Sequence, residues 1–295
     1  MNLVDTLNSK FGIPEHLHFK DGGADLPVAI ITTRHASAAL ALQGGQVLTW
    51  QPQGQQPVLW VSEAAVFEPG KPVRGGVPVC WPWFGALAGS TAHGFVRTRL
   101  WTLRAAELDA DGQLLLRLGI CDDESTRAIW DHAFDLELSV TVGANLTVAL
   151  ATRNTGSSAF AISEALHTYF CTGDIDQTSV LGLDGCHYLD KVNGGVTAQQ
   201  SGPVRFAGET DRVYQDTTAD CVIEDIAWSR NIRIAKQNST ASVVWNPWAE
   251  REKAFADMAS GEYRNMLCVE AANAPAPITL AAGDTHTLGM VISLV

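Results

Sequence analysis

The chain has 295 residues, of which 46% are hydrophobic and 18% charged, and its formal net charge is −12. This composition is typical of a globular protein with a substantial core and excludes a disordered chain. The excess of acidic residues also argues against binding to nucleic acid or to an anionic membrane surface, because both require a basic face.

The first residues contain no basic segment followed by an apolar one, as a secretory signal would have, and no apolar run reaches the length of a membrane span. The six cysteines are widely separated and form no Cys-x-x-Cys pair. We therefore expect reduced thiols and a cytoplasmic protein, monomeric or weakly oligomeric.

Most segments are short, rich in Val, Ile, Thr and aromatic residues, and separated by turn signals such as Asp111-Gly112. In chain order they predict strands at residues 28–33, 46–50, 57–61, 114–120, 136–142, 146–152, 160–170, 232–235, 242–245, 266–269 and 287–294.

Helical periodicity is weak and predicts two short helices, at residues 4–10 and 249–258. Strands and helices do not alternate as they do in proteins with a parallel sheet. The sequence therefore predicts an all-β fold: one large antiparallel β-sandwich with a few short helices, forming a single domain over residues 1–295.

Residues 69–106 carry five basic side chains and no Asp or Glu, against the acidic balance of the whole chain. Arg74 begins the run Arg-Gly-Gly-Val-Pro, and Arg97 ends the run His-Gly-Phe-Val-Arg. Glycine turns beside guanidinium groups can bring several hydrogen-bond donors to a small anion. We therefore expect this segment to form a pocket for a phosphate or carboxylate.

His167 lies in a strand-like stretch, where period-two alternation places it on one face with Ala165 and Tyr169. Leu166 and Phe170 then occupy the opposite, bulky apolar face. The first face is typical of a cavity lining. Taken alone, the residue favours a core histidine hydrogen-bonded to a backbone carbonyl, with a catalytic role as the alternative.

Glu270 follows the apolar run at residues 266–269, where a carboxylate is either a solvated strand end or a base beside a pocket. The residue alone favours the solvated end, because ionised carboxylates are rarely buried without a partner. Trp245 and Trp248 flank an Asn-Pro turn and either pack in the core or form an aromatic floor for a sugar ring. Trp81 and Trp83 allow the same two interpretations.

Several kinds of site lack support in the sequence. No His or Cys residues have the spacing of metal ligands, and there is neither a phosphate-cradling Gly-x-x-x-x-Gly-Lys motif nor a Gly-x-Ser-x-Gly elbow. We therefore expect no metal and no cofactor, and we find no support for nucleotide hydrolysis or serine-based acyl transfer.

Six sequence blocks together indicate a family. They occupy residues 74–82, 93–97, 166–170, 210–214, 245–248 and 268–270. Their order resembles that of the hexose-6-phosphate mutarotases, or glucose-6-phosphate 1-epimerases, a branch of the galactose-mutarotase-like superfamily. The resemblance extends from about Val28 to the C-terminus.

This resemblance implies a β-supersandwich with the active site on its concave face. It implies that His167 is the general acid and Glu270 the general base, that Arg74 and Arg97 take the 6-phosphate of a small sugar, and that Asp211 binds sugar hydroxyls. It places His93 near the reacting end of the sugar. The residues expected to bind substrate are Arg74, His93, Arg97, Asp211 and Trp245.

The chemistry implied is the exchange of α and β anomers, which needs one acid and one base but no redox change. We expect the Glu270 carboxylate to favour imidazolium at His167, so that the proton donor is loaded near neutral pH. Two alternatives stay open: an aldose 1-epimerase acting on unphosphorylated sugars, and a non-catalytic carbohydrate-binding β-sandwich. A regulatory or structural protein that has lost activity is disfavoured, because both His167 and Glu270 are present.

Overall fold

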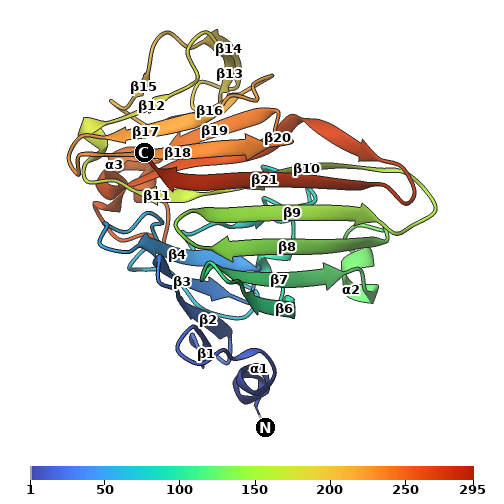
Figure 1. The fold of residues 1–295 in the computed structure, drawn as a ribbon. Coiled ribbons are helices and arrows are strands. Elements are labelled where there is room, and N and C mark those ends of the chain that lie inside the picture. The colour runs from blue at the N-terminus through green and yellow to red at the C-terminus, as the bar shows by residue number, and fades with distance from the viewer. Residues whose placement is uncertain (1) are drawn as a thin grey trace.

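The structure is a computed structural model that describes residues 2–295, and all pairs between its named strands are antiparallel. A four-stranded sheet near the N-terminus has the order β1 (Leu17–Asp21), β2 (Pro27–Thr32), β3 (Ala36–Ala41) and β4 (Gln46–Pro52). This sheet and the first helix lie at the lower end of the molecule in Figure 1.

Two larger sheets form the sandwich. The nine-stranded sheet has the order β15 (Val204–Arg205), β12 (Thr178–Leu181), β17 (Cys221–Asp225), β18 (Arg230–Gln237), β21 (Thr285–Leu294), β9 (Leu146–Asn154), β8 (Phe134–Val142), β7 (Leu114–Cys121) and β6 (Thr102–Leu108). Strands β7, β8, β9 and β21 lie side by side across the middle of Figure 1.

The eight-stranded sheet has the order β14 (Val196–Gln199), β13 (His187–Asp190), β16 (Thr210–Tyr214), β19 (Ala241–Asn246), β20 (Met266–Leu280), β10 (Phe160–Leu166) and β5 (Val79–Cys80), and β11 (Tyr169–Cys171) also pairs with β20. The helices are short: α1 (Leu3–Phe11), α2 (Glu124–Arg127), α3 (Trp248–Glu252) and the 3-10 turns η1 (Val96–Thr98), η2 (Ile175–Gln177) and η3 (Glu262–Asn265). The predicted antiparallel all-β fold with a few short helices is confirmed.

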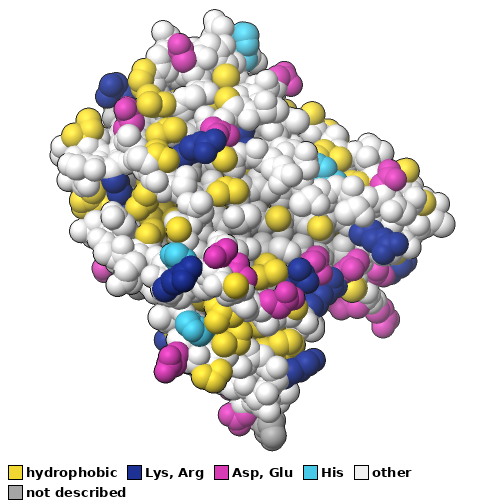
Figure 2. Space-filling view, in the orientation of Figure 1, with side chains coloured by type: hydrophobic (Ala, Val, Ile, Leu, Met, Phe, Trp, Pro, Cys, Tyr) yellow, Lys and Arg dark blue, Asp and Glu magenta, His cyan; other side chains and the backbone are white. Residues whose placement is uncertain are grey.

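The core follows from strand alternation. Strand β8 buries every second side chain from Phe134 to Val142, and β9 repeats this pattern from Leu146. One cluster of buried apolar side chains contains Leu7 of α1, the inner face of β8 and Ile292 of β21. On the face shown in Figure 2, acidic and basic side chains are interspersed rather than gathered into a patch of one sign.

Three predicted elements differ from the structure. Residues 57–61 form only isolated bridges, Leu59 with Phe170 and Val61 with Gly75, because they pair with separate segments instead of one strand. The strand predicted over residues 160–170 is broken after Leu166, so His167 lies between β10 and β11. The helix predicted over residues 249–258 already ends at Glu252, where the chain enters successive turns.

Several strands were not predicted, among them β1, β3, β6 and the short strands β12 to β17. Among residues 2–295, no helix is both long enough and apolar enough to cross a membrane.

Candidate active site

A cavity of about 660 Å³ lies over the eight-stranded sheet. Its lining includes all seven side chains that the sequence singles out as catalytic or substrate-binding: Arg74, His93, Arg97, His167, Asp211, Trp245 and Glu270. The fold therefore brings together residues from β16, β19 and β20, from the break after β10, and from the loops on either side of β5.

Strand register explains why His167 faces Glu270. Leu166 pairs with Ala271 and Tyr169 with Cys268 across β20, so the intervening His167 lies opposite Glu270 on the same face. The His167 Nε2 and Glu270 Oε1 atoms are 3.4 Å apart.

The structure contradicts the interpretation that each of these two residues favours when it is taken alone. The Nδ1 atom of His167 has no hydrogen-bond partner, so the interpretation as a core histidine bonded to a carbonyl is wrong. Glu270 is only 1% exposed, because β20 continues to Leu280 instead of ending at residue 270, so the solvated strand end is also wrong.

The electrostatics of this pair follow from burial. Burial, reinforced by the negative charge of Asp211, raises the pKa of Glu270 well above its usual range. Burial also lowers the pKa of His167, and His93, Arg97 and Arg74 lower it further.

Burial therefore favours the neutral form of both residues, a protonated carboxyl group at Glu270 and an uncharged imidazole at His167. The expectation that Glu270 keeps His167 as an imidazolium is wrong, because the loss of water disfavours both charged forms. One Glu270 oxygen, Oε2, has no partner, as expected for a buried group retained for its chemistry.

His93 has a defined protonation state. Burial and the nearby Arg97, Arg74 and Lys191 lower the pKa of His93 to about 4, so the ring is neutral at pH 7. Its Nδ1 atom accepts a hydrogen bond of 3.3 Å from the Gly85 N–H, which leaves the proton on Nε2. The ring meets that of His167 edge-on, with centroids 5.5 Å apart. His93 can therefore donate a hydrogen bond into the cavity.

The chain bends sharply to place His93. His93 has a φ of 63°, in the left-handed region that is costly for non-glycine residues, and Gly94 follows with a φ of 72°. A Cβ atom at Gly94 would lie 1.7 Å from the Trp81 carbonyl oxygen, so glycine is required at this crossing.

Arg74 is held firmly within the cavity wall. Its Nε and Nη2 atoms donate hydrogen bonds of 3.2 and 3.0 Å to Asp257, and its Nη1 donates one of 3.2 Å to the Tyr169 hydroxyl. The guanidinium also lies 4.6 Å from the centre of the Phe255 ring. Since a guanidinium carries five N–H groups, two stay available for a ligand.

Arg97 forms fewer hydrogen bonds and ion pairs with the protein than Arg74 does. It donates one hydrogen bond of 2.8 Å, to the Ala92 carbonyl oxygen, and within residues 2–295 it forms no ion pair with a carboxylate. The other cations of the basic segment do not line this cavity, since Lys71 pairs with Glu68 and Arg104 with Asp135.

Two further cations line the cavity and were not predicted from the sequence, Lys191 and Arg251. Lys191 follows β13 and precedes an Asn-Gly-Gly turn, which alone suggests only a solvated loop. Arg251 lies in the run Glu-Arg-Glu-Lys, a pattern typical of an exposed helix face. Neither position carries a local signal of ligand binding.

Asp211 and Trp245 are direct neighbours, because β16 and β19 pair these two residues. Burial raises the pKa of Asp211, although Lys191 opposes this shift. The Trp245 ring meets the His167 ring edge-on, with centroids 6.2 Å apart. By contrast, Trp81 is fully buried against Phe95 and so belongs to the core.

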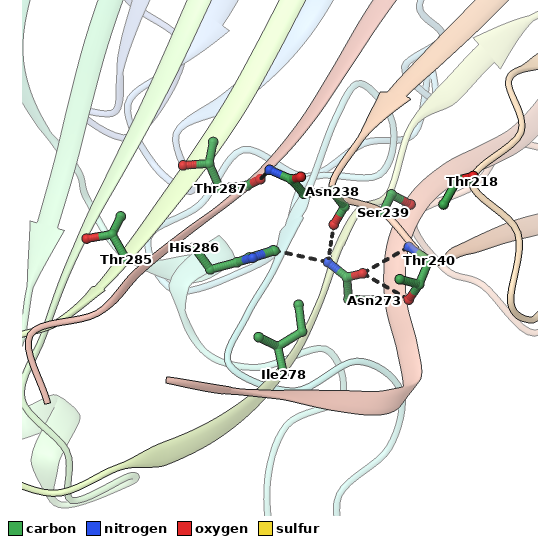
Figure 3. A pocket seen from close by; sticks show the side chains of 9 residues that line it. All are labelled: Thr218, Asn238, Ser239, Thr240, Asn273, Ile278, Thr285, His286 and Thr287. Atoms are coloured by element: carbon green, nitrogen blue, oxygen red, sulfur yellow. Dashed lines mark hydrogen bonds between the residues drawn. The ribbon is translucent and has the colours of Figure 1, made fainter. Parts of the chain in front are cut away.

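A second cavity, of about 470 Å³, has a different character. Its lining contains neither Arg nor Lys, and Figure 3 shows Asn273 hydrogen-bonded to Thr240 on one side and to His286 on the other. The His286 Nε2 atom in turn lies 2.9 Å from the buried Glu164 carboxylate. Since these polar groups are already bonded to one another, they offer few donors or acceptors to a ligand.

Within residues 2–295, no group of three His, Cys, Asp or Glu side chains is placed to hold a metal ion. All six cysteines are free thiols.

Comparison with known proteins assigns the chain to a family. Residues 28–293 match the profile of the aldose 1-epimerases. The chain belongs to the aldose 1-epimerase family. A relative from Escherichia coli K12, provisionally named glucose-6-phosphate 1-epimerase, is 38% identical over 253 residues, which cover 85% of this chain and 84% of the relative. A relative of the same provisional name from Cenchrus ciliaris is 34% identical over 270 residues, which cover 87% of this chain and 81% of the relative.

Solved structures agree with this assignment to the aldose 1-epimerases. A protein from Salmonella typhimurium, provisionally described as a mutarotase, superposes with a TM-score of 0.91 at 32% identity, over 100% of this chain and 99% of the other. A galactose mutarotase-like protein from Clostridium acetobutylicum has a TM-score of 0.71 at 12% identity, over 95% and 98% of the two chains, and so shares the fold alone.

Proposed function

We propose that the protein is a hexose-6-phosphate mutarotase, which interconverts the α and β anomers of sugars like glucose-6-phosphate. The observation that carries this proposal is the cavity itself, where one acid–base pair and four basic side chains line the same space. An epimerase of unphosphorylated sugars needs the pair but has no evident use for the cations. The provisional names of the relatives support the same substrate class.

In the proposed reaction, the Glu270 carboxylate removes the proton from the O1 hydroxyl while His167 protonates the ring oxygen, and the C1–O5 bond opens. Rotation about the C1–C2 bond presents the other face of the carbonyl. The ring then closes as the two residues return their protons in reverse. Each residue supplies roughly 10²–10⁴-fold in rate, which suffices for a reaction without redox change or covalent intermediate.

The other cavity residues have supporting roles in this proposal. His93, neutral with its proton on Nε2, donates a hydrogen bond to the oxygen that gains negative charge. Asp211 accepts hydrogen bonds from sugar hydroxyls, and the Trp245 ring packs against the sugar. Both side chains reach the cavity from neighbouring strands.

The phosphate is proposed to bind the two free N–H groups of Arg74 together with Arg97. It carries about −1.5 to −2 charges at neutral pH. A chain with a net charge of −12 repels such a substrate at long range, so the clustered cations must reverse the field locally. Arginine suits this role because its planar fork matches phosphate geometry.

Exchange spectroscopy by NMR, with glucose-6-phosphate compared against free galactose, tests the proposal. We expect acceleration with the phosphorylated sugar and a much smaller effect with galactose. Preference for galactose would instead favour an aldose 1-epimerase of unphosphorylated sugars, and failure with every aldose would favour a carbohydrate-binding module. If Arg74→Ala leaves the KM for glucose-6-phosphate unchanged, the role assigned to Arg74 is wrong.

The single domain, the cytoplasmic location, the monomeric or weakly oligomeric state and the lack of nucleic-acid and membrane partners stay predictions from the sequence.

A further inference from the structure

The acid–base pair and the cations that we assign to the phosphate line one cavity. The His167 side chain is 12% exposed and that of Glu270 1%. Between side chains as deeply buried as these two, a charge acts over a longer range than it does at the surface. A change of charge at the cations that bind the phosphate therefore affects the protonation of the His167–Glu270 pair.

A direct structural link joins the two ends. Arg74 Nη1 donates a hydrogen bond of 3.2 Å to the hydroxyl of Tyr169. The Tyr169 ring stacks on the His167 ring, with centroids 4.9 Å apart and planes inclined by 11°. Burial raises the pKa of Tyr169 above its usual range, so this residue between the cation and the imidazole is neutral.

The charges around His167 oppose its protonation. Glu270 faces it from β20, but burial favours the neutral form of this carboxyl group. His93 faces it from the loop after β5 and is neutral at pH 7. Arg74 and Arg97 contribute positive charge, and Asp257 compensates Arg74 alone. The remaining charged groups of the lining are Lys191, Glu209, Asp211 and Arg251.

We propose, on the basis of the function proposed above, that the substrate's own phosphate activates the acid–base pair: when the dianion binds Arg74 and Arg97, the proton of the pair passes from Glu270 to His167. The proton moves along the 3.4 Å contact between Glu270 Oε1 and His167 Nε2, so the number of protons on the pair stays the same. His167 then carries the proton that the ring oxygen needs, and Glu270 is the carboxylate that takes the proton from O1.

This coupling makes the phosphate a determinant of turnover as well as of affinity. A sugar without phosphate binds beside a pair whose proton lies on the wrong residue, so its kcat is low even at saturation. The binding energy of the remote phosphate is thus realised in the chemical step.

The first experiment separates the sugar from the anion. The wild-type protein is assayed for anomer exchange on D-xylose, which lacks the C6 group, with and without phosphite dianion. We expect phosphite to raise kcat/KM for xylose by at least about tenfold, equivalent to about 1.4 kcal/mol. Absence of activation, or inhibition by phosphite, overturns the inference.

Two variants test where the anion acts. Arg97→Gln should abolish phosphite activation and lower kcat/KM for glucose-6-phosphate by a larger factor than kcat/KM for xylose alone. A merely structural role of Arg97 would lower both by the same factor. Lys71→Gln is the matched control, because it removes the same charge from the same segment but pairs with Glu68 outside the cavity. It should keep the activation.

The second experiment observes the proton directly. Imidazole nitrogen NMR at pH 7, with the His167 signal assigned from its loss in His167→Gln, is followed during titration with inorganic phosphate. We expect His167 to change from neutral imidazole to imidazolium, and a neutral ring at saturating phosphate overturns the inference. If the wild-type protein does not turn over glucose-6-phosphate at all, the proposed function fails. If it does, but without these responses, only the coupling fails.

Discussion

Arg74 donates two hydrogen bonds to Asp257, of 3.2 and 3.0 Å, across 183 positions of the sequence. The pair joins the glycine-rich loop before β5 to the segment after α3, and Arg251 of α3 and Phe255 of that segment contribute to the cavity wall. Asp257 therefore holds that wall against the loop, and at the same time it reduces the positive charge available to an anion.

Asp257→Asn separates these two effects. We expect the free energy of unfolding to fall by about 1.5–3 kcal/mol, the usual range for a hydrogen bond to a charged group. We also expect KM for glucose-6-phosphate to decrease, because Tyr169 and Phe255 still hold Arg74 while the competing carboxylate is gone. Denaturant unfolding measures the change in stability, and steady-state kinetics measure the change in KM. A raised KM would mean instead that Asp257 is needed to orient Arg74.

His167→Gln should remove the proton donor without closing the cavity. We expect kcat for glucose-6-phosphate to fall roughly 10²–10⁴-fold. KM should change little, because His167 is proposed to act in the chemical step and not to hold the phosphate. The comparison variant is Cys171→Ser, which changes a side chain absent from the cavity lining and should leave kcat near the wild-type value. An equal loss in both variants would contradict the role of His167.

Glu270→Gln should inactivate the enzyme but stabilise the fold at neutral pH. Because the pKa of Glu270 is raised in the folded state, the native protein binds more protons than the unfolded chain above the ordinary value of 4.5, and stability falls as pH rises. Glutamine has no such dependence. We expect the variant to be more stable than wild type at pH 8, with the difference shrinking toward pH 4.5. Thermal unfolding at several pH values measures this trend, and a constant difference would contradict it.

His93 should make the fold sensitive to acid. Its pKa falls from the ordinary 6.5 to about 4, so the unfolded chain binds the additional proton first, and stability is lost as pH drops from about 6.5 to 4. His93→Asn should flatten this part of the pH profile, because Asn tolerates the left-handed φ of 63° and does not titrate.

His93→Val provides the contrast for the backbone. A β-branched residue at a positive φ is strained, so we expect a loss of about 1–3 kcal/mol at all pH values. Denaturation of both variants at pH 7 and pH 4.5 distinguishes the charge effect from the conformational one. Equal stability of the two at pH 7 would contradict the strain argument.

Local signals predicted the scaffold well. Helix α1 is confirmed, and it begins where Asn2 accepts a hydrogen bond from the Asp5 N–H, as an N-cap should. Strands β8 and β9 follow the alternation of their own residues. Residues 57–61 are equally apolar but form no regular strand, because Val58 and Trp60 donate to Trp50 and Tyr169, which belong to different strands. Nothing in the segment itself reveals that division.

The residues of the site could be predicted only when they were considered together. Taken singly, His167 and Glu270 each favoured an uninteresting interpretation, and only the order of six blocks pointed to a catalytic pair. Lys191, Arg251 and Asp257 belong to no block, and their positions in the cavity lining or next to it were not foreseen. Their roles depend on neighbours far away in the chain.

The sequence by itself determined the antiparallel strands, the acidic balance and the basic segment around Arg74, because alternation and charge are properties of neighbouring residues. Only the tertiary structure decided that His167 lies opposite Glu270, since that depends on the register of β10 and β11 against β20. It also decided that the neutral forms of both residues are favoured, because burial removes the water that would otherwise stabilise both charges.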